Sequence, residues 1–218
     1  MASNSEAEAE VQPKRVVPPL YKASGDLASD RLAFFHILER LKTQKRTGWV
    51  DNKIPNPESI SDHMYRMTVL AMCISDQTLD IPKCVMMAAV HDLAEAQVGD
   101  IAPREGIPKV EKRRLEAEAM QNFVHEMLHN SPAALKIMSL WTEYEDQSTV
   151  EARFVKELDL DRFEMAAQAL EYERAHNSRS LQSFFDNSIP HIHHTEVREW
   201  GADLLREREE MRTRAEQQ

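Results

Sequence analysis

The sequence has little glycine and few aromatic residues. Only five of its 218 residues are glycine, and phenylalanine, tyrosine and tryptophan together make up 6%. Alanine, leucine, methionine, glutamate and arginine, which stabilise helices well, are abundant instead. This composition is typical of a helical protein, so we expect an all-α fold. The length favours one domain with one substantial core.

Basic residues are in the minority. Lysine and arginine number 27 against 37 aspartates and glutamates, which gives a formal net charge of −10. Binding along a nucleic-acid polymer needs a basic face, so we expect no such partner. A small phosphorylated ligand is compatible with this charge, because it needs only a local positive site or a metal ion.

Cysteines and long apolar runs are also scarce. The two cysteines, Cys73 and Cys84, both fall in apolar segments, which indicates buried thiols and not a disulfide framework. The first residues lack the basic start and apolar stretch of a secretory signal, and no apolar run is long enough to cross a bilayer. We therefore expect no membrane partner and a cytoplasmic location, with the nucleus as a second compartment.

Composition divides the chain into three regions. Residues 1–25 are acidic and then contain several prolines, and we expect a disordered lead there. Residues 26–205 form the expected domain. Residues 206–218 are rich in glutamate and arginine and are expected to form a charged helix end with a solvated face.

Hydrophobic periodicity and capping residues predict a series of helices. Asp26 or Ser29 is expected to begin the first, and Ser59 with Asp62 has the form of a second helix start. Residues 46–57 break the period and are expected as a loop. The predicted helices are residues 26–45, 59–75, 84–98, 108–128, 132–144, 150–175, 181–186 and 195–212.

Polar residues interrupt the most apolar of these segments, and they are His91, Asp92, Glu95 and Asp100. Burying a carboxylate or an imidazole costs free energy unless hydrogen bonds or a metal ion offset it. On a regular helix, His91, Asp92 and Glu95 would share one broad side. The alternative is a core histidine with satisfied hydrogen bonds beside an aspartate paired with an arginine. A metal site is favoured by further donors elsewhere in the chain, at His63 and at 157–161.

The order of these residues resembles a known signature. His63, the pair His91-Asp92 and a later aspartate resemble the His … His-Asp … Asp pattern of the HD-domain metal-dependent phosphohydrolases. Within that superfamily, Arg46-Thr-Gly-Trp-Val50 and Gly99-Asp-Ile-Ala-Pro103 resemble the 5′-deoxynucleotidases of the HD-domain-containing protein 2 group. The similarity covers about residues 30–205. It implies a single helical HD-domain bundle that depends on a divalent cation, Mn²⁺, Co²⁺ or Mg²⁺.

The resemblance also implies roles for the polar residues. His63, His91, Asp92 and a distal aspartate would hold the main cation. Imidazoles with carboxylates suit such an ion and leave positions for water and a phosphate oxygen. Glu95 and Asp100 would face the phosphate and the attacking water. They would act as general base and acid or hold a second cation, and both alternatives stay open.

Two aspartates compete for the place of the distal ligand. The family usually reads Phe-Val-Lys-x-Leu-Asp-x-x-Glu-Met, whereas this chain is two residues longer between Phe154 and Met165. The upstream match selects Asp159, and the downstream match selects Asp161. A continuous helix would have one buried stripe, formed by Phe154, Leu158, Asp161 and Met165. This phase favours Asp161, with Asp159 as the alternative.

The resemblance places a nucleotide beside Arg46, Trp49, Asp100 and Ile101. An arginine fork suits a phosphate, and an indole face can pack on a sugar or a base. A ribonucleotide would be excluded if Trp49 crowds its 2′ position. The alternative for Trp49 is an anchor for the loop. Arg66 is expected in a structural salt bridge, and residues 191–194 are expected to form a solvated or capping histidine cluster.

The implied enzyme hydrolyses deoxyribonucleoside 5′-monophosphates to a deoxyribonucleoside and phosphate, and relatives suggest a homodimer. One alternative is an HD-type phosphodiesterase acting on another nucleotide, since the same ligands cut many phosphate esters. The other is a binding or scaffold protein that keeps the metal for stability alone. A scaffold gives no reason for Glu95 and Asp100 beside the metal ligands, so the enzyme is favoured.

Overall fold

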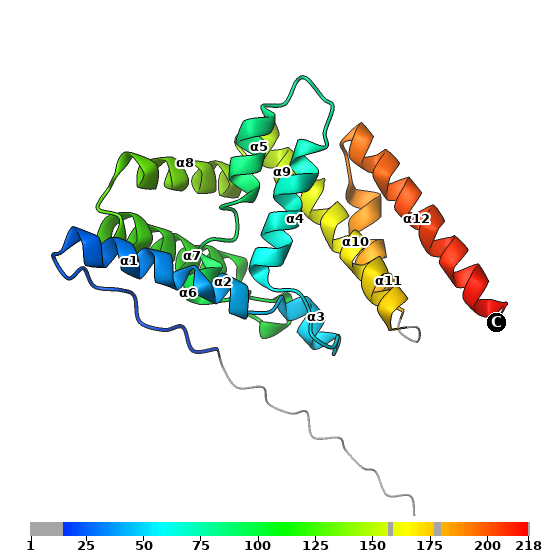
Figure 1. The fold of residues 1–218 in the computed structure, drawn as a ribbon, viewed down its shortest axis with the longest axis horizontal. Coiled ribbons are helices and arrows are strands. Elements are labelled where there is room, and N and C mark those ends of the chain that lie inside the picture. Colours follow the sequence, from blue (N-terminus) through cyan, green and yellow to red (C-terminus); the bar gives the residue numbers. More distant parts are fainter. Residues whose placement is uncertain (1–14, 157–158, 177–179, 218) are drawn as a thin grey trace, which may run out of the picture.

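The structure is a bundle of helices. The computed structural model describes residues 15–156, 159–176 and 180–217 (Figure 1). These ranges contain no β-strand, and one isolated antiparallel bridge joins Lys45 to Ser59. The all-α prediction is confirmed. In chain order the elements are α1 (Leu27–Ile37), α2 (Glu39–Thr43), α3 (Thr47–Asp51), α4 (Ile60–Met72), α5 (Ile81–Ala88), α6 (Glu95–Val98), η1 (Pro103–Glu105), α7 (Lys109–Asn122), η2 (Phe123–Met127), α8 (Pro132–Asp146), α9 (Val150–Val155), α10 (Leu160–Ala175), α11 (Gln182–Ser188), η3 (Ile189–His191) and α12 (Thr195–Glu216).

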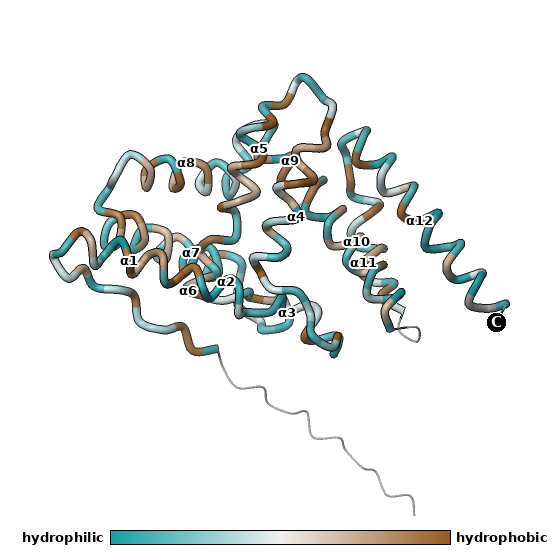
Figure 2. Tube along the Cα trace, viewed as in Figure 1, coloured by the Kyte–Doolittle hydropathy of each residue, from teal (hydrophilic) through white to brown (hydrophobic). Residues whose placement is uncertain are grey.

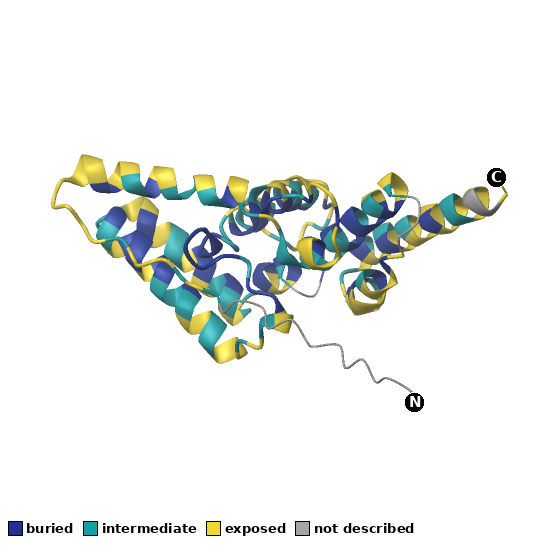
Figure 3. Cartoon of the chain, turned by 90° about the horizontal axis from the view of Figure 1, so that it is seen from below, coloured by how far each residue is buried: buried dark blue, intermediate teal, exposed yellow. Residues whose placement is uncertain are grey.

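The helices form two groups, and α4, α5 and α9 lie between them (Figure 1). Helices α1, α2, α6, α7 and α8 gather at one end, around an apolar cluster that includes Phe123. Helices α10, α11 and α12 lie at the other, where a cluster includes Leu170. Buried residues face inward along these helices, and exposed residues cover the outside (Figure 3). Each fully buried large apolar side chain contributes about 1.5–3 kcal/mol to this arrangement.

Helix α4 begins where the sequence predicts. Ser59 accepts a hydrogen bond from Asp62 N at 3.2 Å, and Asp62 Oδ2 accepts one from Ser59 N at 2.8 Å. These reciprocal bonds satisfy two backbone groups that the first turn would otherwise leave unpaired. They fix His63 in that first turn. Asp26 caps α1 by accepting a hydrogen bond from Ser29 N at 3.1 Å.

The predicted helix over 84–98 is not continuous. Helix α5 ends at Ala88, residues 89–94 form tight turns, and α6 begins at Glu95. Val90 N bonds to Met87 O and Leu93 N to Val90 O, so the backbone bonds here span three residues and not four. The expectation that His91, Asp92 and Glu95 share one regular helix is therefore wrong.

Other predicted boundaries also change. Residues 150–175 divide into α9 and α10, so Phe154 lies on a different helix from Asp161 and Met165, and Leu158 of the predicted stripe lies outside the described residues. Residues 26–45 divide into α1 and α2 at Leu38, where Leu41 N bonds back to Leu38 O. The predicted loop over 46–57 contains the short helix α3.

The segment before α1 is part of the fold. Residues 15–25, here called the strap, run along α6, α1 and α7, and this corrects the prediction of a disordered lead for that segment. Tyr21 Oη donates to Asp30 Oδ1 at 2.6 Å, and Asn122 Nδ2 donates to Tyr21 O at 2.8 Å. The expected disorder of residues 1–14 concerns residues outside the described part of the chain.

The charged end of α12 is not entirely solvated. Arg208 is buried, donates two hydrogen bonds of 2.7 Å to Glu173, and lies over the Phe185 ring at 3.6 Å from its centroid. The predicted solvated face is thus corrected at Arg208, while Figure 2 shows hydrophilic residues along much of the helix. Burial needs this pairing, because an isolated buried charge is costly.

The cysteines are free thiols, and Cys84 is buried as expected. Cys73 is exposed, which corrects that part of the prediction, because it follows the last residue of α4. Within the described ranges, no helix combines the length and the apolar character that crossing a membrane requires.

Asp30 joins the strap to α1 through its buried carboxylate, and we expect the stability that this contact contributes to depend on pH. Hydrogen bonds from Tyr21, and then from Ser24, hold the pKa of Asp30 well below its ordinary value. The stabilisation is therefore complete above the unfolded pKa of about 4 and is lost as pH falls below it. We expect Asp30→Asn to lower the urea midpoint at pH 7 and to lose less stability than wild type between pH 5 and 3.

The matched control is Asp203→Asn, because Asp203 lies in an exposed salt bridge with Arg206, and such pairs contribute little. Equal urea midpoints for Asp30→Asn and Asp203→Asn at pH 7 would contradict the prediction.

Candidate metal centre

Two histidines and an aspartate from separate elements meet inside the bundle. His63 lies on α4, and His91 and Asp92 lie in the turns between α5 and α6. Asp92 Oδ2 is 3.2 Å from His91 Nε2 and 3.9 Å from His63 Nε2. Candidate ligand atoms of all three lie within 4.8 Å of one another, and both histidines are buried. The break after α5 thus turns His91 and Asp92 toward α4.

The first turn of α10 adds a second carboxylate. Asp161 Oδ1 lies 3.5 Å from His63 Nε2. Asp159 Oδ1 instead accepts hydrogen bonds from His193 N and His194 N, both at 2.6 Å, at the start of α12. The structure therefore brings Asp161 to the cluster, whereas Asp159 binds the backbone just before α12.

The donor atoms fit a cation. His63 Nε2, His91 Nε2 and Asp161 Oδ1 are buried, and none has a hydrogen-bond partner among the described residues. The opposite ring nitrogens are occupied, because His91 Nδ1 donates to Ala88 O at 2.8 Å and His63 Nδ1 lies 2.6 Å from Glu164 Oε2. Such contacts place the proton on Nδ1 and direct the Nε2 lone pair outward, as metal-binding histidines require.

Arg46 brings a positive charge to the cluster. Its Nη1 lies 3.2 Å from Asp92 Oδ2. Burial alone would lower the pKa of Arg46, but the Asp100 and Asp92 carboxylates raise it well above its ordinary value. Burial would likewise raise the pKa of Asp92, yet His91 and Arg46 hold it well below its usual range. Both groups therefore stay charged.

Glu95 is buried at the start of α6. Its Oε1 lies 3.9 Å from Lys112 Nζ, and its Oε2 has no hydrogen-bond partner in the described part of the chain. Burial raises the pKa of the Glu95 carboxyl well above its ordinary value, and Asp92 and Asp100 raise it further. A carboxyl of this kind can accept a proton more readily than a solvated one.

Asp100 joins the loop after α6 to the start of α3. Its Oδ2 accepts a hydrogen bond from Thr47 N at 2.6 Å, and Thr47 Oγ1 donates to Asp100 O at 2.7 Å. Asp100 is thereby held next to Arg46. The side chain of Ile101 is buried in the cluster around Phe123.

Trp49 packs inside the protein. It is 3% exposed, stacks on Phe184 with ring centroids 4.3 Å apart, and donates from Nε1 to Glu58 Oε1 at 2.7 Å. These contacts agree with the loop-anchor alternative. A contact between Trp49 and a nucleotide stays a prediction.

Two glutamates, buried Glu164 and half-buried Glu58, were missed by the reasoning from sequence. Glu164 contacts His63, and Glu58 lies beside both, with ligand atoms of the three residues within 4.8 Å of one another. Burial, together with the Glu164 charge, raises the pKa of Glu58 to about 7. The signal for Glu164 was its place in an apolar helix one turn after Asp161. The expected salt bridge of Arg66 is confirmed, since it pairs with Glu171 at 2.9 Å.

This fold and this cluster define the class of protein. The HD domain family matches residues 38–199, and the chain belongs to that family. It is 46% identical to 5′-deoxynucleotidase hdd1 of Schizosaccharomyces pombe over 179 residues, or 81% of this chain and 89% of that protein. It is 45% identical to human 5′-deoxynucleotidase HDDC2 over 186 residues, with 85% and 89% covered.

A solved structure is similar as well. The HD domain-containing protein YGK1 has a TM-score of 0.64 and 32% identity, and the match covers 86% of this chain and 90% of that one. The expected family is therefore confirmed by sequence and by fold.

The two aspartates near α10 can be separated by experiment. Asp161 lies at the cluster, whereas Asp159 accepts hydrogen bonds from His193 N and His194 N, just before α12. We expect Asp161→Ala to weaken Mn²⁺ binding by at least about tenfold in calorimetric titrations, with little change in Tm. Asp159→Ala should keep the Mn²⁺ affinity and lower the Tm, because two backbone N–H groups lose their acceptor, and one lost hydrogen bond costs about 1 kcal/mol. The reverse pattern would exclude Asp161 as the distal ligand.

Proposed function

We propose that this protein is a metal-dependent 5′-deoxynucleotidase, which hydrolyses deoxyribonucleoside 5′-monophosphates to a deoxyribonucleoside and phosphate. The observation that carries this proposal is the set of buried, unpartnered imidazole and carboxylate atoms beside a charged arginine. The names of the relatives hdd1 and HDDC2 support the substrate class.

In this proposal His63, His91, Asp92 and Asp161 hold one divalent cation. Imidazole nitrogens mixed with carboxylates suit Mn²⁺ or Co²⁺ and also accept Mg²⁺. When bound, the cation supplies positive charge that stabilises the phosphate in the transition state and lowers the pKa of a nearby water. Glu164 keeps His63 in the binding orientation through its 2.6 Å contact.

The remaining residues act on the phosphate ester. Glu95 removes a proton from the attacking water as its oxygen bonds to phosphorus. The bond from phosphorus to the 5′ oxygen breaks, and Asp100 transfers a proton from solvent to that departing oxygen. Alternatively, Glu95 and Asp100 hold a second cation. Arg46 binds the phosphate through its guanidinium. The resemblance to the 5′-deoxynucleotidases puts Trp49 and Ile101 beside the nucleoside, and ribonucleotides would bind poorly if Trp49 crowds the 2′ position.

The experiment measures phosphate release from a panel of deoxy- and ribonucleoside 5′-monophosphates, with Co²⁺, Mn²⁺ or Mg²⁺ added to chelator-treated protein. We expect turnover of the deoxynucleotides with at least one cation and much slower turnover of ribonucleotides. A bis-nucleotide phosphodiester and the Asp161→Ala variant are the controls. Faster cleavage of the diester would favour a phosphodiesterase, and release from no substrate would favour a scaffold.

The proposal includes a homodimer in the cytoplasm. Tyr65, Val69 and Met72 are exposed on α4, and their spacing of four and three residues places them on one face. An apolar stripe of this kind offers a contact for a second copy.

Light scattering can test this contact. We expect the wild-type chain to have the mass of a dimer and Val69→Glu to have the mass of a monomer, because a buried unpaired charge is costly. Leu135→Glu on the exposed face of α8 is the matched control and should leave the mass unchanged. A monomeric wild-type chain would remove the dimer from the proposal.

A further inference from the structure

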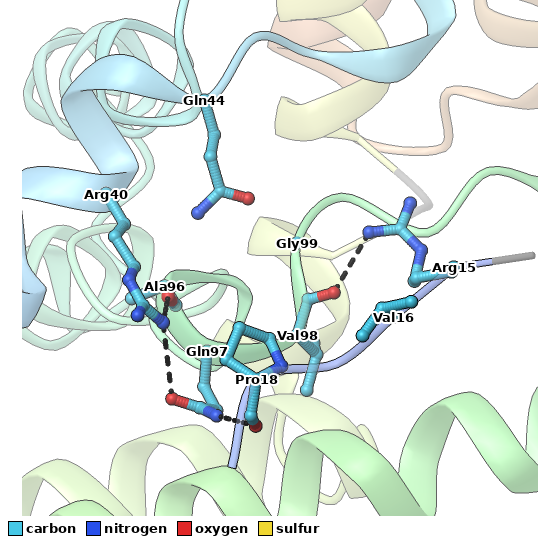
Figure 4. A pocket seen from close by; sticks show the side chains of 9 residues that line it. All are labelled: Arg15, Val16, Pro18, Arg40, Gln44, Ala96, Gln97, Val98 and Gly99. Carbon is cyan, nitrogen blue, oxygen red and sulfur yellow. Dashed lines mark hydrogen bonds between the residues drawn. The ribbon is translucent and has the colours of Figure 1, made fainter. Parts of the chain in front are cut away.

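Arg15 in the strap binds the loop that carries Asp100. Its Nη1 donates to Val98 O at 2.9 Å, and its Nη2 donates to Asp100 O at 2.6 Å. Figure 4 shows the guanidinium turned toward the carbonyl of Val98. One planar group therefore holds the backbone on both sides of Gly99.

Glu105 fixes the guanidinium from the other end of the same loop. Its Oε2 accepts from Arg15 Nε at 2.7 Å, and its Oε1 accepts from Arg15 Nη2 at 2.5 Å. Glu105 Oε1 also accepts a hydrogen bond from Ala102 N at 2.9 Å. A bidentate pair of this kind sets the orientation of an arginine as well as its position. The loop from Val98 to Glu105 is thus closed around Arg15.

Gly99 is shaped for this contact. Its φ is +78°, and a Cβ added there would lie 2.3 Å from Arg15 Nη1. Any side chain at position 99 would therefore strain the backbone and displace the guanidinium. The glycine allows the arginine to approach the backbone closely.

The contact extends from Arg15 to the cluster through Asp100. Asp100 O accepts hydrogen bonds from both Arg15 and Thr47, and its carboxylate accepts one from Thr47 N. We propose that Arg15 is a positioning residue, which holds Asp100 against Thr47 and so keeps the Asp100 carboxylate beside Arg46. Arg15 itself contacts neither His63 nor Asp92 through any described hydrogen bond or ion pair.

Polar contacts, more than apolar packing, keep Arg15 and the strap in contact with the loop from Val98 to Glu105. A cavity of about 350 Å³ lies beside the strap, bordered by Arg15, Pro18, Gln97 and Gly99 among others (Figure 4). Apart from Arg15, the described bonds between the strap and this region are those from Gln97 Nε2 to Pro18 O at 2.6 Å and Pro19 O at 3.4 Å. Removing one guanidinium should therefore release the loop without unfolding the domain.

The test compares Arg15→Ala, Arg15→Lys, Asp100→Asn and the double variant Arg15→Ala/Asp100→Asn, and its kinetic part rests on the proposed function. With the most rapidly hydrolysed nucleotide of the panel, we expect Arg15→Ala to lower kcat by about 10- to 100-fold. KM should change by less than about threefold, since Arg15 touches no substrate. Lysine should restore part of kcat, because it keeps the charge but not the fork.

Two results would distinguish positioning from a general structural role. The double variant should be no slower than Asp100→Asn alone, since both changes act on one group. Mn²⁺ affinity should stay as in wild type, and hydrogen exchange of the peptide 98–105 should accelerate in Arg15→Ala. Arg114→Ala is the matched control, because Arg114 pairs with Glu111 and Glu118 on the exposed face of α7.

The proposal is overturned if Arg15→Ala keeps kcat within twofold of wild type, or if the losses of Arg15→Ala and Asp100→Asn multiply. If the wild-type protein releases phosphate from no substrate, the proposed function fails separately. Hydrogen exchange then tests, without any measurement of activity, whether Arg15 holds this loop in place. Unchanged exchange of residues 98–105 in both arginine variants would overturn the proposal.

Discussion

The structure depends on one constraint, which is that imidazole and carboxylate groups inside a helical bundle must be satisfied. His63 Nε2 and His91 Nε2 are removed from solvent and have no described partner. Leaving such a group unpaired costs about 1–3 kcal/mol, which a bound ligand would offset. Arg46 and Asp92 stay charged against the effect of burial, because Asp100 and Asp92 raise the pKa of Arg46, and His91 and Arg46 lower the pKa of Asp92. A cation shared by these groups, as proposed above, would satisfy the constraint.

Interruptions of the helices create this arrangement. A continuous helix through Ala88 and Glu95 would place His91, Asp92 and Glu95 on one broad side, whereas the observed turns direct His91 and Asp92 toward α4. A second interruption separates α9 from α10, so that Asp161 falls in a first helical turn and faces His63. Irregular backbone held by a rigid scaffold is where binding groups are most often found.

Residues outside the His … His-Asp … Asp pattern position the side chains of the candidate metal centre. Glu164 orients His63, and Thr47 holds the carboxylate of Asp100. Trp49 donates a hydrogen bond to Glu58, which lies beside His63 and Glu164, and its indole stacks on Phe184. The centre is therefore supported by buried contacts on several sides, and its geometry does not depend on exposed ion pairs, which contribute little.

Reasoning from the sequence predicted the features that depend on neighbouring residues. Composition predicted an all-α protein, and the Ser59–Asp62 pair predicted the start of α4, because caps and periodicity act within one or two turns. The break after Ala88 has no glycine or proline to announce it, and the polar, proline-bearing strap has the composition of a disordered segment. Only the tertiary structure decided that Asp161 approaches His63 and that Arg15 meets the carbonyl of Val98. These contacts join residues about a hundred positions apart, and the packing that brings them together is not encoded in any local pattern.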